Sequence, residues 1–491
     1  MSAEATHQSV VVLSSSLLTD RMLRYSDWGK CLGTNADTEV WATACPQNPM
    51  SNPEAFRVMP FPRVGAFREF PHNYLRRLNE FAWDYRLRAP SRLSVIHHIR
   101  DRTQSVQVKA LKIPARLMAW TGLHRPFENR LNQMLLAYPR SREARERLRE
   151  LKPAALVATG PQRYEEPAVV AEAINLKIPV LALITSWDNL TTKGRMLFEY
   201  DGYLVWSEQM KRELHEFYPH SRKVPVYVVG APQFDVFFQE RFQQSREEFC
   251  RSQGLDPSKP YVLYALGSPN FLKEHHGALA FAQRVQRGEL GDIQVLVRPH
   301  PLFDQGKEAE LLRGLAPGVI VQRTGDAEMA LTARTQDCNQ IKEWVNTFRH
   351  ASVVVNFSST VGIDAAIFDK PVVNLDFDPE PGQPNQALVK DVNHLWSHFK
   401  PIAESGGMWL ADDMDEVVHA VREYLVHPEL HREKRRWMAE YVCGYIDGKC
   451  GERMVQAIMD FVQRRSSTSC VSSDAATPVG TRSDPVTAAR K

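Results

Sequence analysis

Three consecutive hydroxyl residues, Ser358, Ser359 and Thr360, stand between a β-branched run and a segment with helical spacing. The run at 353–355 predicts a buried strand, and apolar residues in 362–368 recur as they do on one face of a helix. The first turn of a helix offers free backbone N–H groups and the positive end of the helix dipole, so it attracts anions. We therefore expect a phosphate site at this turn, although any one of these hydroxyls alone would more simply cap the helix.

Asp364 and the run VLVRPHP at 295–301 extend this candidate site. Asp364 has three roles open to it: complementing the helix dipole, holding a ribose hydroxyl, or orienting the hydroxyl turn. The prolines of the second run stop regular strand structure and fix how Arg298 and His300 project. Arg298 can offer its planar fork to phosphate oxygens, and His300 can donate to a diphosphate or a leaving group. A structural turn with a hydrogen-bonded histidine is the alternative.

Gly267 and Ser268 end another predicted strand, at 261–268. Small residues there let backbone N–H groups approach a ligand, so we expect both to contact the donor, although most such loops only turn the chain. The following run, 273–276, contains adjacent Glu and His residues without the spacing of a helical metal site, and we expect it on the surface. No metal site is predicted elsewhere.

Asp188 lies in the loop SWDNLTTKG, 186–194, at the end of a predicted strand. A carboxylate at a strand end can take the proton of an acceptor hydroxyl, so Asp188 is the candidate general base. The alternative is an Asx-type turn that caps a short helix.

Strand and helix patterns alternate through most of the 491 residues, which predicts parallel sheets covered by helices on both faces. The expected fold is α/β, with two doubly wound Rossmann-like domains facing a central cleft. We place the first domain at 1–232, with a basic helical insert at about 57–150. The second is placed at 233–464, after a hinge near 230–235, and the Ser/Thr-rich tail at 465–491 is predicted to be disordered. Ligands of such sheets bind beyond the strand carboxyl ends.

The segment NFSSTVGIDAAIFDKPVVNLDFD, with RPHP upstream, resembles the second domain of GT-B-fold transferases. It is most similar to the CDP-glycerol glycerophosphotransferase group, whose pattern Asp-Tyr-Ser-Ser, Asp, Lys/Arg-Pro and a strand ending near Asp matches several residues here. These are Ser358, Ser359, Asp364, Lys370, Pro371 and Asp376, with His300 on the group's Arg-x-His-Pro element. Asn356 and Phe357 replace the group's Asp and Tyr, which leaves a nucleotide sugar open as the donor. The UDP-N-acetylglucosamine 2-epimerases share the fold that this resemblance implies.

The charge distribution is uneven. Residues 57–149 hold 20 Lys/Arg and 7 Asp/Glu, a balance of +13, whereas the whole chain carries only +3. This insert, with its aromatic residues, predicts contact with an anionic membrane surface or acceptor, and a solvated Arg-rich face is the alternative. Seven scattered cysteines, no evident signal peptide and no long apolar run favour a cytoplasmic protein, with peripheral attachment at the inner membrane face as a further expectation.

The resulting hypothesis is a metal-independent GT-B-like transferase without a cofactor. It moves a sugar or polyol phosphate from a nucleotide-sugar or CDP-polyol donor to a glycan or lipid-linked acceptor. A 2-epimerase-like enzyme and a catalytically silent nucleotide-sugar-binding protein remain alternatives. Nucleic acid is not an expected partner, since no base-reading module is visible.

Overall fold

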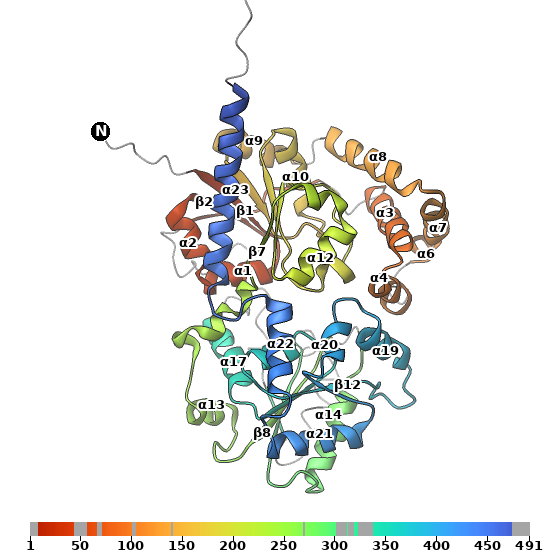
Figure 1. Cartoon of the computed structure of the whole chain (residues 1–491), viewed down its shortest axis with the longest axis vertical. Coiled ribbons are helices and arrows are strands. Elements are labelled where there is room, and N and C mark those ends of the chain that lie inside the picture. The colour runs from red at the N-terminus through yellow and green to blue at the C-terminus, as the bar shows by residue number, and fades with distance from the viewer. Residues whose placement is uncertain are drawn as a thin grey trace, which may run out of the picture.

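Two parallel sheets form the framework of the chain (Figure 1). The computed structural model describes residues 8–43, 56–65, 71–100, 105–138, 141–268, 271–300, 312, 319–322 and 337–473. Within these residues the first sheet has seven strands: β1 (Ser9–Ser14), β2 (Asp37–Ala42), β3 (Arg57–Pro60), β4 (Ala155–Ala158), β5 (Val180–Leu183), β6 (Gly202–Val205) and β7 (Val226–Val228). The second sheet has six: β8 (Tyr261–Ala265), β9 (Gln294–Arg298), β10 (Val319–Val321), β11 (Val353–Asn356), β12 (Val372–Leu375) and β13 (Trp409–Ala411).

Both sheets are doubly wound. The strand orders are β3-β2-β1-β4-β5-β6-β7 and β10-β9-β8-β11-β12-β13. Neighbouring strands among the described residues run parallel, with Val12 opposite both Val40 and Val157 in the first sheet. The order reverses between β1 and β4 and again between β8 and β11, which are the points where ligands of such sheets bind. The predicted α/β fold of two Rossmann-like units is therefore confirmed.

Helices cover the two sheets, and this explains why their central strands are almost wholly apolar. Val353, Val354 and Val355 of β11 are fully buried. In the first unit the helices are α1 (Leu17–Tyr25), α2 (Asp27–Asn35), α9 (Arg142–Leu151), α10 (Glu166–Asn175), α11 (Asn189–Thr192) and α12 (Glu208–Phe217). In the second they are α13 (Arg246–Gln253), α14 (His275–Gln286), α17 (Cys338–Arg349), α18 (Val361–Ile367), α19 (Gln386–His394), α20 (Lys400–Glu404), α21 (Met414–Val426) and α22 (Arg432–Cys443).

The predicted basic insert is a helical arm at the side of the first unit (Figure 1). Its helices are α3 (His72–Leu87), α4 (Pro90–Ser94), α6 (Val106–Ala110), α7 (Lys112–Thr121) and α8 (His124–Ala137), with a π-helical turn at Val95–Arg100. Its predicted start at 57 differs from the structure, because 57–60 forms the edge strand β3. That strand is short and only half-buried, so its sequence lacks the apolar run of a central strand.

The last helix, α23 (Cys450–Ser473), corrects the predicted boundary at 464. It returns to the first unit, where Met454, Ile458 and Phe461 join the core cluster of β1 and β4. The backbone N–H groups of Cys450 and Gly451 donate to Asp235 at 3.1 and 2.7 Å. These bonds fix the place where the chain returns to the first unit, beside the predicted hinge at 230–235. The helix also runs past the predicted start of the tail at 465, while residues from 474 lie outside the described residues.

The two units contact each other through segments that follow strand carboxyl ends. Arg21 of α1 donates from Nη2 to Oε1 of Gln233 at 3.4 Å, and its guanidinium lies 4.5 Å from the ring centre of Trp344 in α17. A hydrogen bond of 2.7 Å joins Thr191 Oγ1, after β5, to His398 Nδ1. The carboxyl edges of the two sheets thus meet at the junction of the units.

Candidate active site

The hydroxyl turn after β11 lies where the sequence places it, but its three hydroxyls have different surroundings. Ser358 adopts a positive φ of 32° and donates its N–H to Asn374 Oδ1 and its hydroxyl to Asn393 Oδ1, both at 2.6 Å. The hydroxyl of Ser359 accepts a long bond, 3.4 Å, from the N–H of Val361 and makes no other hydrogen bond among the described residues. Ser358 therefore holds the shape of the turn, whereas the neighbouring hydroxyls keep more capacity for a ligand.

Thr360 begins α18 without a side-chain capping bond. Its φ of −53° is already helical, and its hydroxyl makes no hydrogen bond within the described part of the chain. An unused donor and acceptor at a strand end is what a phosphate oxygen requires. Of the three predicted hydroxyls, Thr360 is thus the one that the fold leaves most available.

Asp376, after β12, is a hydrogen-bonding centre on the same edge. This buried carboxylate accepts from Lys390 Nζ and His394 Nε2 at 2.8 Å each, and from Asn393 Nδ2 at 2.9 Å. The three donors come from one face of α19, at i, i+3 and i+4 spacing. Sequence reasoning missed them, although this polar spacing was a readable signal. Lys390 and His394 remain about two-fifths exposed, and Lys390 also contacts Asp412 at 2.9 Å, so the edge carries a network of paired polar groups.

Arg298, at the end of β9, shares its surroundings with Asp364 and with Arg21 from the other unit. Asp364 accepts from Trp344 Nε1 at 3.2 Å, while its Oδ1 has no hydrogen-bond partner among the described residues. Burial raises the pKa of Asp364 to about 7, and the two arginines oppose that rise. Asp364 thus lies near Arg298, with its carboxyl buried against the ring of Trp344.

The protonation of His300, the second candidate residue of the RPHP run, depends on its burial and on the neighbouring Arg298. Burial, and then the charge of Arg298, lower the pKa of His300 from its ordinary value. The imidazole is therefore neutral at pH 7, and its N–H group can donate to an oxygen without carrying a charge. Arg298 itself donates from Nη1 to Gln322 at 3.5 Å.

Gly267 differs from its predicted role. Its N–H donates to the carboxylate of Glu274, so this group does not face a ligand. Glu274 and His275 are buried, which contradicts the expected surface position of 273–276. Burial raises the pKa of Glu274 to about 8, against hydrogen bonds from the N–H groups of Gly267 and Phe357. Glu274 thus bridges the ends of β8 and β11, and Ser268 follows this bridge.

Asp188 belongs to a different cluster, formed by the loop after β5 and a segment of the second unit. It accepts from Ser186 Oγ at 2.6 Å and Thr192 Oγ1 at 2.9 Å, and Lys193 Nζ lies 3.9 Å away. Burial opposes its charge, yet Lys193, His398 and these hydroxyls together hold the pKa of Asp188 below its ordinary value. The carboxylate is ionised at neutral pH, and its side chain is 29 % exposed.

His398 closes this cluster from the second unit. Burial lowers the pKa of His398 to about 4, so the ring is neutral, and it packs edge-on against Trp187 with ring centres 4.9 Å apart. The predicted residues therefore form three groups: the hydroxyl turn, the pair Arg298 and Asp364, and Asp188 at the junction of the units.

The family model for CDP-glycerol:poly(glycerophosphate) glycerophosphotransferase matches residues 188–460, more than half of the chain. The match begins at Asp188 and includes every predicted donor-binding residue. The chain belongs to this family. It is a transferase enzyme that uses a nucleotide-activated donor, which confirms the resemblance stated from the sequence.

Solved structures with the same fold include UDP-N-acetylglucosamine 2-epimerases. A putative enzyme of this kind from Listeria monocytogenes is 12 % identical, with a TM-score of 0.53, over 94 % of this chain and 98 % of that one. The enzyme from Neisseria meningitidis bound to UDP-GlcNAc is 12 % identical, with a TM-score of 0.51, over 92 % and 100 %. S. aureus MnaA bound to UDP is 11 % identical, with a TM-score of 0.52, over 93 % and 97 %. At this identity the likeness establishes the GT-B fold alone. No curated protein sequence matches the chain.

Proposed function

We propose that the enzyme transfers a polyol phosphate from a CDP-activated polyol to a hydroxyl of a glycan or lipid-linked acceptor. The observation that carries this proposal is the family match, which spans the whole carboxyl edge of the second sheet. Asn356 and Phe357, where the family pattern has Asp and Tyr, are both buried under that edge rather than facing outward. These two differences from the family pattern therefore leave the exposed side chains of the edge unchanged. They do not by themselves favour a sugar donor.

The proposed step is a substitution at phosphorus. The acceptor oxygen bonds to the phosphorus that carries the polyol, the bond from that phosphorus to the bridging oxygen breaks, and CMP leaves with the electron pair. The acceptor proton passes to a base. Because charge grows on the leaving phosphate, positively charged and hydrogen-bonding groups fixed at that place lower the barrier most.

The second unit supplies these groups in our proposal. Arg298 and the N–H of His300 bind the diphosphate, with Ser359 and Thr360 as further donors and Ser358 holding the turn. Lys390 and His394, which both contact Asp376, add further hydrogen-bond donors at this edge. We propose that this set works without a metal ion. The described residues contain no cluster of three or more His, Cys, Asp and Glu side chains suited to a metal, and activity in excess EDTA would test the point.

Asp188 is the proposed proton acceptor. Its lowered pKa keeps it ionised, and its position between the units places it where an acceptor bound to the first unit would approach a donor on the second. The same low pKa makes it a weak base, so its contribution depends on how closely it contacts the hydroxyl.

We also propose that the helical arm holds the enzyme on an anionic membrane, where a lipid-linked acceptor resides. Ile113, Leu117 and Trp120 follow one face of α7 and are 73 %, 57 % and 83 % exposed, with Val106 and Leu123 exposed beside them. The opposite face of α7 is occupied, because Ala115 packs on α3. Lys109, Lys112 and Arg116 accompany this apolar stripe. An apolar face flanked by cations is the pattern of a helix that lies in a membrane interface.

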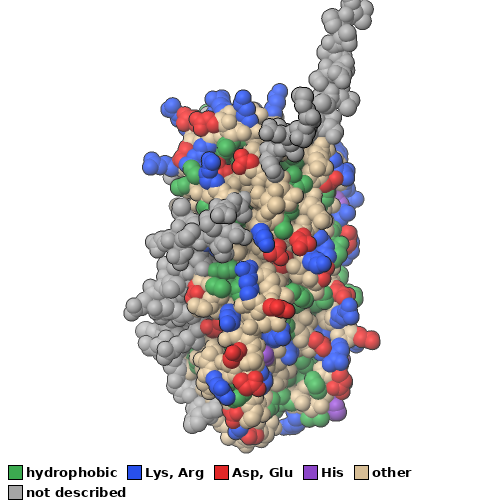
Figure 2. Space-filling model, turned by 90° about the vertical axis from the view of Figure 1, so that its left-hand side faces the viewer, with side chains coloured by type: hydrophobic (Ala, Val, Ile, Leu, Met, Phe, Trp, Pro, Cys, Tyr) green, Lys and Arg blue, Asp and Glu red, His purple; other side chains and the backbone are tan. Residues whose placement is uncertain are grey.

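Charged side chains elsewhere on the molecule are arranged differently from those beside this apolar stripe. On the face drawn in Figure 2, which lies on the side away from the arm, acidic and basic side chains intermingle. Within the insert, Arg76 and Arg92 are buried and paired with Glu80 and Asp84. Part of the +13 balance therefore stabilises the arm, and in our proposal the cations beside the apolar stripe meet the lipid. Among the described residues, no helix is long and apolar enough to cross a bilayer.

Vesicle flotation tests the membrane proposal. We expect the wild-type enzyme to float with anionic vesicles at low salt and to be released by high salt. Trp120→Ser should reduce flotation severalfold, because Trp120 is the most exposed large apolar side chain of the stripe. Trp437→Ser, which alters a 44 % exposed tryptophan of α22, is the matched control and should float normally. Equal flotation of the two variants would reject the arm as the attachment site.

A donor panel tests the transferase proposal. The expected result is release of CMP from a CDP-polyol only when an acceptor is present, with a new phosphodiester visible by ³¹P NMR. Release of a nucleoside diphosphate from a nucleotide sugar would identify a sugar transferase instead. Conversion of a UDP-sugar without an acceptor would support the epimerase alternative, which the fold likeness keeps open, and binding without turnover would indicate a silent protein.

A further inference from the structure

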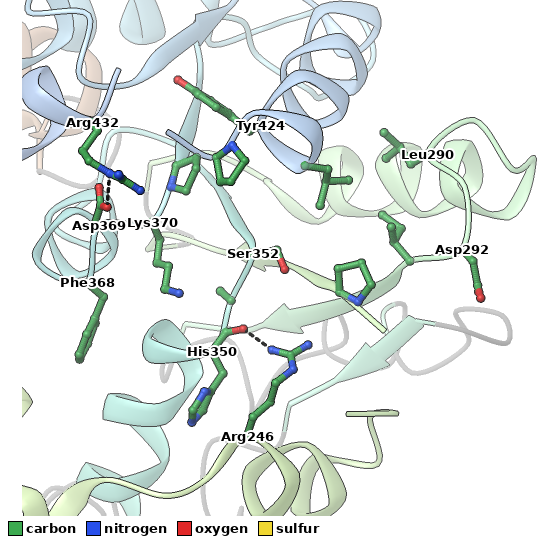
Figure 3. A pocket seen from close by; sticks show the side chains of 16 residues that line it. Arg246, Leu290, Asp292, His350, Ser352, Phe368, Asp369, Lys370, Tyr424 and Arg432 are labelled. Atoms are coloured by element: carbon green, nitrogen blue, oxygen red, sulfur yellow. Dashed lines mark hydrogen bonds and ion pairs between the residues drawn. The ribbon is translucent and has the colours of Figure 1, made fainter. Parts of the chain in front are cut away.

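A pocket of about 620 Å³ lies at the amino edge of the second sheet (Figure 3). Pro260, Ile293, Ser352 and Pro371 line it, and they directly precede β8, β9, β11 and β12. The candidate active site is formed by residues that follow these same strands. The pocket is therefore separate from that site, and nothing in the proposed transfer uses it.

Lys370 is the central feature of this pocket. Its side chain lines the pocket on the side of Phe368 and Asp369 and points toward His350, as Figure 3 shows. It makes no hydrogen bond or ion pair with any residue that the structure describes. Burial, followed by the charge of Arg246, lowers the pKa of Lys370. A half-buried ammonium among other cations is costly unless an anion accompanies it.

The acidic side chains of the pocket are already paired elsewhere. Asp369 accepts from Arg432 Nε at 2.7 Å and from Arg435 Nη2 at 2.8 Å. Asp292 is 77 % exposed and lies 2.8 Å from Lys259 Nζ. Neither carboxylate neutralises Lys370 by direct contact.

Arg246 is held by backbone carbonyls near Lys370 and has no carboxylate partner among the residues that the structure describes. It donates to three backbone carbonyls, those of Pro257, Lys259 and His350, at 3.0, 2.7 and 2.7 Å. The carbonyl bonds fix the guanidinium but leave its charge uncompensated. His350 does not add to that charge, because burial lowers its pKa. Among the described residues the pocket therefore presents two cations without a directly contacting carboxylate, together with the hydroxyl of Ser352.

We propose that this pocket binds a small organic phosphate. Lys370, Arg246 and Ser352 contact the phosphate oxygens, and the apolar side chains of Leu290 and Ile293 contact the organic part. The volume lies within the range of small-molecule sites and exceeds what a bare phosphate ion needs. Because β11 and α18 join Ser352 to Lys370 through the hydroxyl turn, the two sites share one continuous segment.

The test uses glycerol 3-phosphate as the probe and glycerol as its phosphate-free control. Limited acetylation of the full-length protein, read by mass spectrometry, reports each lysine separately and so distinguishes this pocket from the active site. Glycerol 3-phosphate should slow acetylation of Lys370 severalfold and leave the exposed Lys449 unchanged, and glycerol should change neither. Acetylation of Lys370 at an unchanged rate in saturating glycerol 3-phosphate would overturn the proposal.

Calorimetry on variants gives a second, independent measurement. Lys370→Met removes the charge but keeps an unbranched side chain, and it should weaken glycerol 3-phosphate binding at this pocket by about tenfold or more. Lys449→Met removes one exposed charge and should bind as the wild type does. Equal affinity of the two variants would contradict the proposal. If Lys370→Met fails to fold, acetylation of the wild-type protein still decides the question.

Discussion

The reversal points of the two sheets are built alike and differ in the charge around them. In the first unit, buried Glu166 accepts from the N–H of Gly160 at 2.7 Å and from the hydroxyl of Ser15, bridging the ends of β4 and β1. In the second unit, buried Glu274 bridges the ends of β8 and β11 through N–H groups. Each unit thus uses one buried carboxyl to close the point where its strand order reverses.

The side chains around the two reversal points differ. Glu166 accepts from the hydroxyl of Ser15 with Arg163 nearby, and the hydroxyls of Thr19 and Thr159 bond to each other at 2.9 Å. The second edge carries Arg298, Lys390 and His394 close to the hydroxyl turn. The same backbone arrangement is therefore lined mainly by hydroxyls in one unit, whereas in the other the guanidinium of Arg298 lies beside Asp364 of the helix that follows the hydroxyl turn. In the proposed function, this difference makes the second unit the donor side.

The largest expected effect comes from removing the cation at the end of β9. Arg298→Met should lower kcat/KM about 1,000-fold, roughly 4 kcal/mol, because the leaving phosphate loses a charged donor in the transition state. Steady-state kinetics with a CDP-polyol measures this. Arg163→Met, which removes an arginine near Gly160 at the first reversal point, is the matched control and should cost less than about threefold. Equal losses would refute the assignment of the donor to the second unit.

The two buried carboxyls should give different pH dependences of stability. Burial raises the pKa of Glu166 to about 7 and that of Glu274 to about 8, both from 4.5. The native state therefore holds protons that the unfolded state has lost, so their stabilisation is complete below pH 4.5 and disappears as the pH rises through 7 and 8, respectively. Glu274→Gln should remove roughly 5 kcal/mol of this loss, at about 1.4 kcal/mol for each unit of the raised pKa.

Urea unfolding between pH 4.5 and 8.5 separates the two groups. Glu166→Gln should flatten the decline mainly below pH 7, whereas Glu274→Gln should also flatten the interval from 7 to 8. A wild-type slope in the Glu274→Gln variant would mean that this carboxyl is already ionised in the native protein.

A smaller effect distinguishes the hydroxyls of the turn. Ser358→Ala should lower the free energy of unfolding by about 1–2 kcal/mol, because Asn374 and Asn393 lose a buried partner. Thr360→Val should leave stability within about 0.5 kcal/mol and weaken nucleotide binding, since its hydroxyl has no partner among the described residues. Thermal unfolding and calorimetry measure the two quantities, and a reversed pattern would exchange the assigned roles.

The sequence predicted the elements that local patterns encode. The β-branched runs identified the central strands, and the hydroxyl turn and the RPHP run identified the loops of the second edge. Long-range packing was not predictable in this way: Thr191 meets His398 across 207 residues, and α23 returns to the first sheet. Glu274 was misplaced on the surface because its partner is a backbone N–H group, and no side-chain pattern marks such a bond.

Hydrogen exchange of the wild-type enzyme with a CDP-polyol tests the central claim most directly. The account predicts slower exchange at 356–364, in the end of β11 and the hydroxyl turn, because the donor phosphates contact this segment. Residues 15–20 and 159–166, at the reversal point of the first sheet, should exchange as in the free enzyme. Protection confined to the first unit, under conditions in which CMP is produced, would contradict the account.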